Sequence, residues 1–119
     1  MCGILGVINF DGRPVDKEKV LSARDILAHR GPDDAGIYYS TLNPLTSNQQ
    51  TSNYITNIAL AHRRLSIIDL SPAAHQPMTT EDGRFTIVYN GEIYNFAELR
   101  GALSGKLLAL NQKEFKTSS

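Results

Sequence analysis

The feature that most restricts the fold is the spacing of short apolar segments rich in β-branched and aromatic residues. The first covers residues 4–10 and ends at the turn sequence "DGRP"; the later ones read "GIYYS" (36–40), "NIALAH" (57–62) and "FTIVYN" (85–90). Each has the length of a strand and is bounded by turn-forming residues. Because helical segments interrupt them, the pattern predicts a chain of mixed α+β class.

The first helix has clear start and stop signals. Asp16 can cap a helix that begins near Lys17. "RGPD" (30–33) is expected to end it, since Gly31 suits the position after the last turn and Pro32 cannot continue a helix. The face expected to be buried carries Val20, Ala23 and Leu27.

Two further stretches complete the outline. Asn95 followed by Glu98 has the spacing of a helix-start box and predicts a second helix through about Leu103. Residues 105–119 are expected to hold a helix remnant and a final strand. Residues 41–56 are mostly polar and predict a solvated loop.

Length and charge exclude several classes of function. The 119 residues suit one domain, and 12 basic residues balance 12 acidic ones, so no nucleic acid or membrane partner is expected. With one cysteine and no Asn-x-Ser/Thr acceptor, the chain fits the reducing cytoplasm. The three histidines have no zinc-ligand spacing, so we expect no metal site: His29, His62 and His75.

The single cysteine is Cys2, directly after the initiator methionine. A lone cysteine is usually a small buried apolar residue, and that reading needs no chemistry. At this position, however, removal of Met1 would give Cys2 a free α-amine. Such amines titrate near pH 7.7–8.0, so roughly a third are neutral at pH 7.5, against about 0.1% of lysines. The amine would thus be a usable base, tethered to the thiol that it activates.

Three other stretches are candidates for function: "HRRLSIID" (62–69), "HQPM" (75–78) and "NGEIYN" (90–95). Each alone has an ordinary explanation. Asn-Gly is a frequent hairpin turn, adjacent arginines usually form a solvated face or a surface ion pair, and "HQPM" is a Pro-marked loop.

Taken in order, "MCGILGV", "HRGPD", "HRRLSIIDLSPAAHQPM" and "NGEIYNFAELR" resemble the N-terminal glutaminase domain of class II glutamine amidotransferases. "HRRLSIID" is most similar to the branch of glutamine-hydrolysing asparagine synthetases. The hexosamine-phosphate synthase branch has a Trp-containing segment there, and this chain has no Trp. The resemblance implies an N-terminal-nucleophile (Ntn) hydrolase fold, an αββα sandwich of which these 119 residues are roughly the first half.

The resemblance also implies the catalytic roles. Cys2 would be the nucleophile that attacks the side-chain amide of glutamine. The Asn90 side-chain amide and the Gly91 N–H would form the oxyanion hole. Gly3 would leave space beside the nucleophile, although a simple turn glycine is the alternative.

A substrate pocket follows from the same comparison. Arg64 would bind the substrate α-carboxylate, a bidentate task that suits a guanidinium. Arg30 and Asp33 would organise a nearby loop. The remaining pocket residues implied by the resemblance are Leu65, Ser66, Ile67, Ile68, Asn90, Gly91 and Glu92.

The resemblance implies no cofactor for this chain. ATP and Mg²⁺ belong to a synthetase domain that lies outside residues 1–119, and the chain is expected to be a partial amidotransferase domain, ending one residue before the aspartate that binds the glutamine α-amino group. L-glutamine, the ammonia-accepting synthetase domain and a homodimer of the full-length protein are the implied partners. Two alternatives stay open: a non-catalytic fragment of a longer asparagine synthetase-like protein, and an Ntn hydrolase with another amide substrate.

Overall fold

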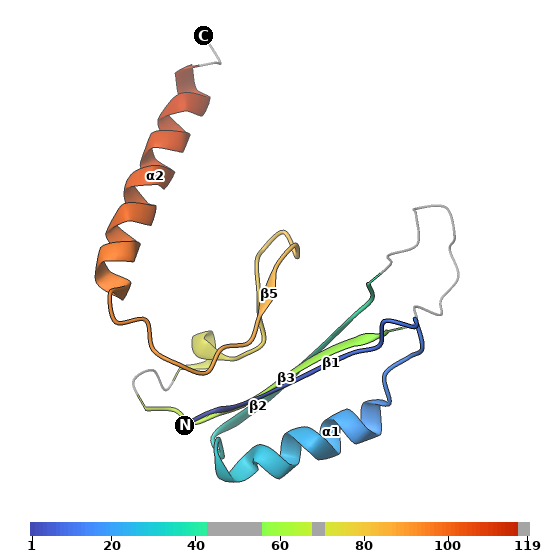
Figure 1. Ribbon diagram of the computed structural model, residues 1–119. Coiled ribbons are helices and arrows are strands. Elements are labelled where there is room, and N and C mark those ends of the chain that lie inside the picture. Colours follow the sequence, from blue (N-terminus) through green and yellow to red (C-terminus); the bar gives the residue numbers. More distant parts are fainter. Residues whose placement is uncertain (43–55, 68–70, 117–119) are drawn as a thin grey trace.

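The computed structural model describes residues 1–42, 56–67 and 71–116. It is a mixture of helices and strands, which confirms the predicted α+β class (Figure 1). The predictions for the polar loop (residues 43–55 of 41–56), for Ile68 and for residues 117–119 lie outside the described residues. The elements, in chain order, are β1 (Gly3–Ile8), α1 (Lys17–Ile26), the 3-10 turn η1 (Leu27–His29), β2 (Asp34–Ser40), β3 (Ile58–Arg64), the 3-10 turn η2 (Pro72–Ala74), β4 (Met78–Thr79), β5 (Thr86–Ile87) and α2 (Phe96–Lys116).

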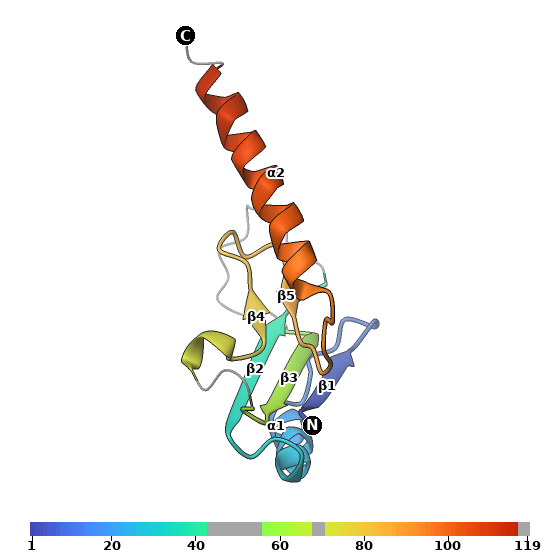
Figure 2. The ribbon, with the colours of Figure 1, turned by 90° about the vertical axis from the view of Figure 1, so that its left-hand side faces the viewer.

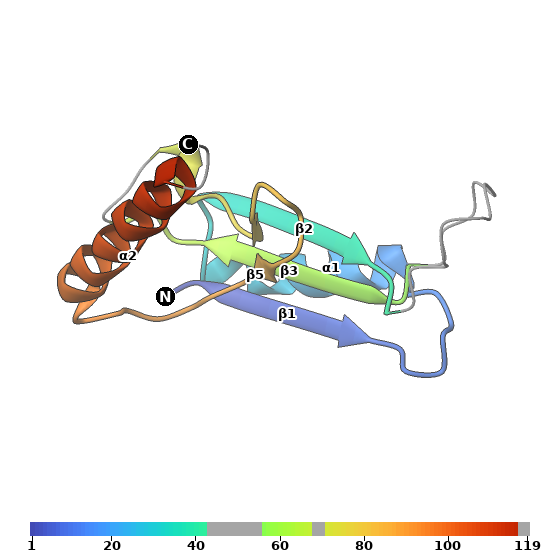
Figure 3. The ribbon, with the colours of Figure 1, turned by 90° about the horizontal axis from the view of Figure 1, so that it is seen from above.

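The main sheet has three antiparallel strands in the order β1-β3-β2, so β3 is central (Figure 3). Its register places Ile4 of β1 and Gly36 of β2 on either side of His62. Helix α1 covers one face of the sheet, and the β4–β5 hairpin lies on the opposite side (Figures 1 and 2). The core lies between α1 and the sheet and consists of Val15, Val20 and Ala59, with Leu5, Val7, Ile37 and Tyr39 packed around them.

Helix α1 begins where the sequence predicts. The Lys19 N–H donates to Asp16 Oδ1 at 3.1 Å, so Asp16 is the N-cap. Val20 is buried and Ala23 and Leu27 are half-buried, which confirms the predicted face. The helical turns end at His29, immediately before "RGPD".

Gly31 directly follows the C-cap Arg30, as predicted, and its N–H donates to the Leu27 carbonyl at 3.4 Å. Its backbone does not adopt the left-handed conformation of a helix-terminating glycine. Instead, a Cβ at Gly31 would collide with the carbonyl group of Arg63 and lie 2.6 Å from the Arg64 nitrogen. Glycine is required here because the chain passes directly against β3.

The last predicted strands also differ from the structure. Of "FTIVYN", only Thr86 and Ile87 form a strand, paired with Met78 and Thr79. Helix α2 begins after Asn95 as predicted but continues to Lys116, so the final strand predicted within 105–119 is absent up to that residue. The helix projects away from the sheet (Figures 1 and 2). Among the described residues, no helix is both long and apolar enough to cross a bilayer.

Candidate active site

Cys2 lies at the start of β1, and its sulfur faces the chain just beyond the end of β3. The Leu65 N–H points at Cys2 Sγ, with N and Sγ 3.4 Å apart, and the thiol lies 3.9 Å from the Leu65 carbonyl oxygen. The Leu65 N–H is thus a backbone donor held against the cysteine sulfur. Met1 is 77% exposed, which leaves the chain start open to solvent.

Two contacts fix the backbone around Cys2. Arg30 Nε donates to the Cys2 carbonyl oxygen at 3.2 Å. The predicted empty space beside Gly3 is not there, because a Cβ on Gly3 would lie 2.9 Å from Leu27 Cβ. Gly3 therefore serves close packing of β1 against η1, and the space next to it is filled.

The segment after β3 is held by Asp33. The Ser66 N–H donates to Asp33 Oδ2 at 2.7 Å, and the Asp33 N–H donates to the Arg64 carbonyl at 3.0 Å. These bonds join "HRGPD" to "HRRLSIID", as expected for residues that organise a loop. They fix the position of Leu65, whose N–H faces the cysteine sulfur.

Arg64 is only 8% exposed, and its Nη1 donates to the Ser71 carbonyl at 2.9 Å. A pocket of about 250 Å³ lies around it. His75 Nδ1 lies 2.6 Å from Asp34 Oδ2 on the pocket wall, and since a carboxylate only accepts, the imidazole donates. The pocket thus combines a cation with carboxylates, and two of its residues, Arg64 and Ser66, flank Leu65 in the chain. Its lining residues are Asp33, Asp34, Arg64, Ser66, Ser71, Pro72 and His75.

Of the other predicted pocket residues near β3, Ser66 lines this pocket, whereas Ile67 is 74% exposed and is not among the lining residues. Asn90, Gly91 and Glu92 lie elsewhere, on the link between β5 and α2 (residues 88–95), which we call the Asn-Gly segment. In all three views this segment passes close to the N-terminus of the chain (Figures 1, 2 and 3). The fold therefore brings the Asn-Gly segment toward the start of β1, although they are far apart in sequence.

His62 lies next to the Asn-Gly segment, although sequence reasoning gave it no role. It is 1% exposed on the central strand, and its Nε2 donates to the Tyr89 carbonyl at 3.3 Å, at the start of the Asn-Gly segment. Burial lowers the pKa of His62 below its ordinary value of 6.5 and keeps the ring neutral. The only sequence signal was its place in "HRRLSIID".

Gln76 binds the other main-chain group of Tyr89. Its Oε1 accepts from the Tyr89 N–H at 2.6 Å. A Cβ on Gly36 would collide with the Gln76 carbonyl oxygen, so the "HQPM" segment lies directly on β2. "HQPM" is therefore the connection between β2 and the Asn-Gly segment.

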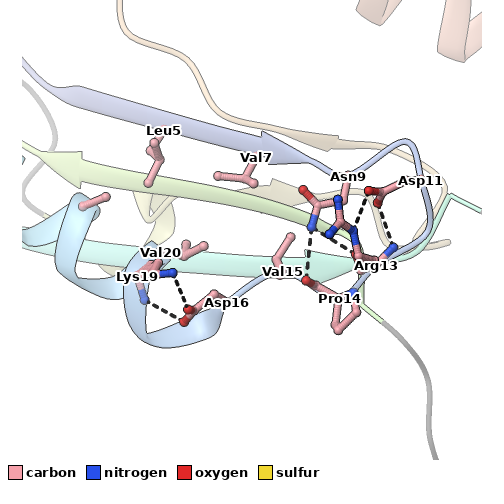
Figure 4. A pocket seen from close by; sticks show the side chains of 11 residues that line it. Leu5, Val7, Asn9, Asp11, Arg13, Pro14, Val15, Asp16, Lys19 and Val20 are labelled. Carbon is pink, nitrogen blue, oxygen red and sulfur yellow. Dashed lines mark hydrogen bonds and ion pairs between the residues drawn. The ribbon is translucent and has the colours of Figure 1, made fainter.

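A larger hollow of about 460 Å³ lies between α1 and β1 (Figure 4). Its walls are apolar, and the charges on its rim are paired with each other: Arg13 Nε lies 2.6 Å from Asp11, and Lys19 Nζ lies 3.2 Å from Asp16. It contains none of the predicted site residues. Across the described part of the chain, no three His, Cys, Asp or Glu side chains gather as a metal site would require.

This arrangement of an N-terminal cysteine, a buried arginine and an Asn-Gly segment agrees with the comparison to known families. Residues 1–119 match the glutamine amidotransferase domain family, and the chain belongs to it. Within that family it is similar to glutamine-hydrolysing asparagine synthetases, which confirms the predicted resemblance. No solved structure gives a significant match.

Three relatives illustrate the extent of the similarity. Asparagine synthetase [glutamine-hydrolyzing] of Brassica oleracea is 41% identical over 104 residues, which is 87% of this chain and 15% of that protein. Asparagine synthetase [glutamine-hydrolyzing] 1 of Bacillus subtilis is 33% identical over 114 residues, 93% of this chain and 16% of that protein. Amidase chry2 of Gibberella zeae is 37% identical over 98 residues, which is 82% of this chain and 12% of that protein. The chain thus spans less than a fifth of the length of these relatives.

Proposed function

We propose that this chain hydrolyses glutamine to glutamate and ammonia, with Cys2 as nucleophile. The observation that carries the proposal is the contact between Cys2 Sγ and the Leu65 N–H, next to the buried Arg64. The thiol faces the backbone N–H of the residue that directly follows Arg64 in the chain, and a buried arginine suits the α-carboxylate of an amino-acid amide.

In the proposed reaction, Met1 is first removed and the α-amine of Cys2 takes the proton from the thiol. The thiolate attacks the side-chain amide carbon of glutamine, and the α-ammonium returns its proton to the leaving nitrogen, which departs as ammonia. Water then attacks the thioester and gives a proton to the amine, which passes it to the sulfur as glutamate leaves. Asn90 and Gly91 donate to the oxyanion in both steps.

Arg64 binds the substrate α-carboxylate in this proposal, and Ser66 lines the pocket around it. The pocket around Arg64 supports this assignment, because it also holds Asp33 and Asp34, whose carboxylates suit an α-ammonium group. No cofactor takes part in these steps.

We further propose that the ammonia serves ATP-dependent synthesis of asparagine from aspartate, in the cytoplasm, by a longer protein in which another domain holds ATP and Mg²⁺. The names of the Brassica and Bacillus relatives support this acceptor. The order of α1, main sheet and β4–β5 hairpin is compatible with the first layers of an αββα sandwich, which we propose as the complete fold.

Incubation of the purified chain with glutamine tests the proposal. Glutamate and ammonia should appear in equal amounts, and Cys2→Ala should lower the rate by about a thousandfold or more, because no other nucleophile replaces the sulfur. Mass spectrometry should show that the active chain begins with Cys2. Activity of a chain that retains Met1 would contradict the role of the α-amine.

Equal rates for the wild type and Cys2→Ala would instead favour a non-catalytic fragment of a longer asparagine synthetase-like protein. A specific observation supports that second candidate: apolar side chains outside the core are exposed, among them Ile4 at 48%, Phe85 at 64% and Ile87 at 56%. Such surfaces are typical of contacts with further polypeptide.

A further inference from the structure

Tyr89 is the point at which the Asn-Gly segment is attached to the rest of the fold. The β4–β5 ladder ends at Ile87, so strand pairing no longer holds the chain at residue 89. Instead, two side chains bind the Tyr89 backbone: its N–H donates to Gln76 Oε1 at 2.6 Å, and its carbonyl accepts from His62 Nε2 at 3.3 Å. Both main-chain groups of one residue are thus satisfied by separate parts of the fold.

Both anchoring side chains are themselves fixed. His62 is 1% exposed on the central strand of the sheet. The backbone of Gln76 lies against Gly36, where no side chain fits, and the preceding His75 is bonded to Asp34 of β2. The position of Tyr89 is therefore determined by the sheet rather than by its own loop.

The contact continues to the next residues. A Cβ on Gly91 would lie 2.7 Å from the Tyr89 hydroxyl oxygen, so the Tyr89 side chain folds back over Gly91. With the backbone of residue 89 fixed and its ring packed on residue 91, the peptide groups between them have little freedom. These are the groups that precede and include the proposed oxyanion donors.

We propose that Gln76 and His62 are positioning residues, which orient the Asn90 side chain and the Gly91 N–H by holding the peptide groups on both sides of Tyr89. This inference rests on the proposed function. Donors for an oxyanion act only at hydrogen-bond distance, and a displacement of about 1 Å can cost roughly a hundredfold in rate. Neither side chain needs to touch glutamine for this effect.

Gln76 offers a matched pair of variants. Gln76→Met keeps the length of the side chain but loses the acceptor, whereas Gln76→Glu keeps an acceptor oxygen for the Tyr89 N–H. We expect Gln76→Met to lower kcat for glutamine about ten- to a hundredfold with KM changed less than threefold, and Gln76→Glu to restore kcat to within about threefold of wild type. If Gln76 had a purely structural role, kcat would fall equally in both variants, or only their thermal stability would fall.

Amide hydrogen exchange of residues 88–95 provides a readout that does not depend on activity. Gln76→Met should accelerate exchange in this segment, and Gln76→Glu should not. If Gln76→Met fails to fold, His62→Leu and His62→Gln replace the pair, because the glutamine amide can still donate to the Tyr89 carbonyl.

The outcomes separate the two proposals. If the wild type hydrolyses glutamine no faster than Cys2→Ala does, the proposed function fails. Amide hydrogen exchange alone then decides whether Tyr89 is held as we infer. Unchanged kcat in Gln76→Met in an active chain, or an equal loss in both variants, overturns the positioning role. Unchanged exchange in Gln76→Met overturns it whether or not the chain is active.

Discussion

At the scale of single residues, close backbone approach explains two glycines of this chain. Gly31 lies against the backbone of Arg63, and its carbonyl accepts from Arg63 Nε at 2.9 Å. Gly36 lies against the Gln76 carbonyl. At each position the absent side chain allows a loop to pack directly on a strand, so that residues of "HRGPD" and "HQPM" reach the candidate site.

Gly31→Ala is therefore expected to lower the free energy of unfolding by about 1–3 kcal/mol, because β3 or the loop must move to admit the methyl group. Gly101→Ala in α2 is the matched control: nothing lies within 4 Å of its Cβ position. Alanine favours helix, so this control should not lower stability. Chemical denaturation of both variants checks the prediction, and equal effects would contradict the packing argument.

At the scale of elements, α1 and α2 differ in what stabilises them. α1 has a side-chain cap and a buried Val20 against the sheet. In α2, Phe96 is 63% exposed, Leu99 44% and Leu103 61%. Because most helical stability in proteins comes from packing of an apolar face, residues 96–106, the part of α2 whose side chains are described, have little to hold them beyond the hydrogen bonds of the helix.

We expect the backbone amides of α2 to exchange with solvent much faster than those of β3 in the isolated chain. Native-state hydrogen exchange followed by mass spectrometry measures this directly. A protein surface that covers residues 96–103 should slow the exchange. Protection of α2 equal to that of β3 would mean that the helix is packed in solution.

At the scale of the whole molecule, one sheet organises two different faces. The face toward α1 carries the apolar core, whereas the opposite face carries His62 at the contact with Tyr89. The sheet therefore provides stability through one surface and positions the candidate site through the other. His62 therefore bears on both the stability of the fold and the geometry of the candidate site.

This arrangement predicts a pH dependence of global stability. Burial lowers the pKa of His62, assisted by the charges of Arg64 and His75 and opposed by the Tyr89 carbonyl and Asp34. In the unfolded chain the ring titrates near 6.5, so below that pH the unfolded state binds more protons. The contribution of His62 to the free energy of unfolding is fully present above pH 6.5. It is lost as the pH falls through the lower pKa that His62 has in the folded state.

Thermal and chemical unfolding between pH 7.5 and pH 5 should show this loss in the wild type. His62→Gln cannot titrate but can still donate to Tyr89, so its stability should depend less on pH over the same range. His29→Gln serves as the exposed control and should behave as the wild type does. Identical slopes for the wild type and His62→Gln would contradict a buried neutral histidine.

The sequence by itself determined the features that depend on neighbours a few residues away. The Asp16 cap, the start of α2 after Asn95 and the positions of the motifs follow from local hydrogen bonds and turn chemistry. Those motifs, in order, also determined the family. These features could be found without the fold because the interactions that produce them act over only a few residues.

Only the tertiary structure decided how the motifs meet. Cys2 and Leu65 are 63 residues apart in sequence, and His62 and Tyr89 are 27 apart, so their contacts depend on the strand order and register of the sheet. The same holds for Gly31, whose requirement for glycine comes from β3 and not from its own turn. Strand pairing across a long separation selects one register by packing, and no local pattern along the chain carries that information.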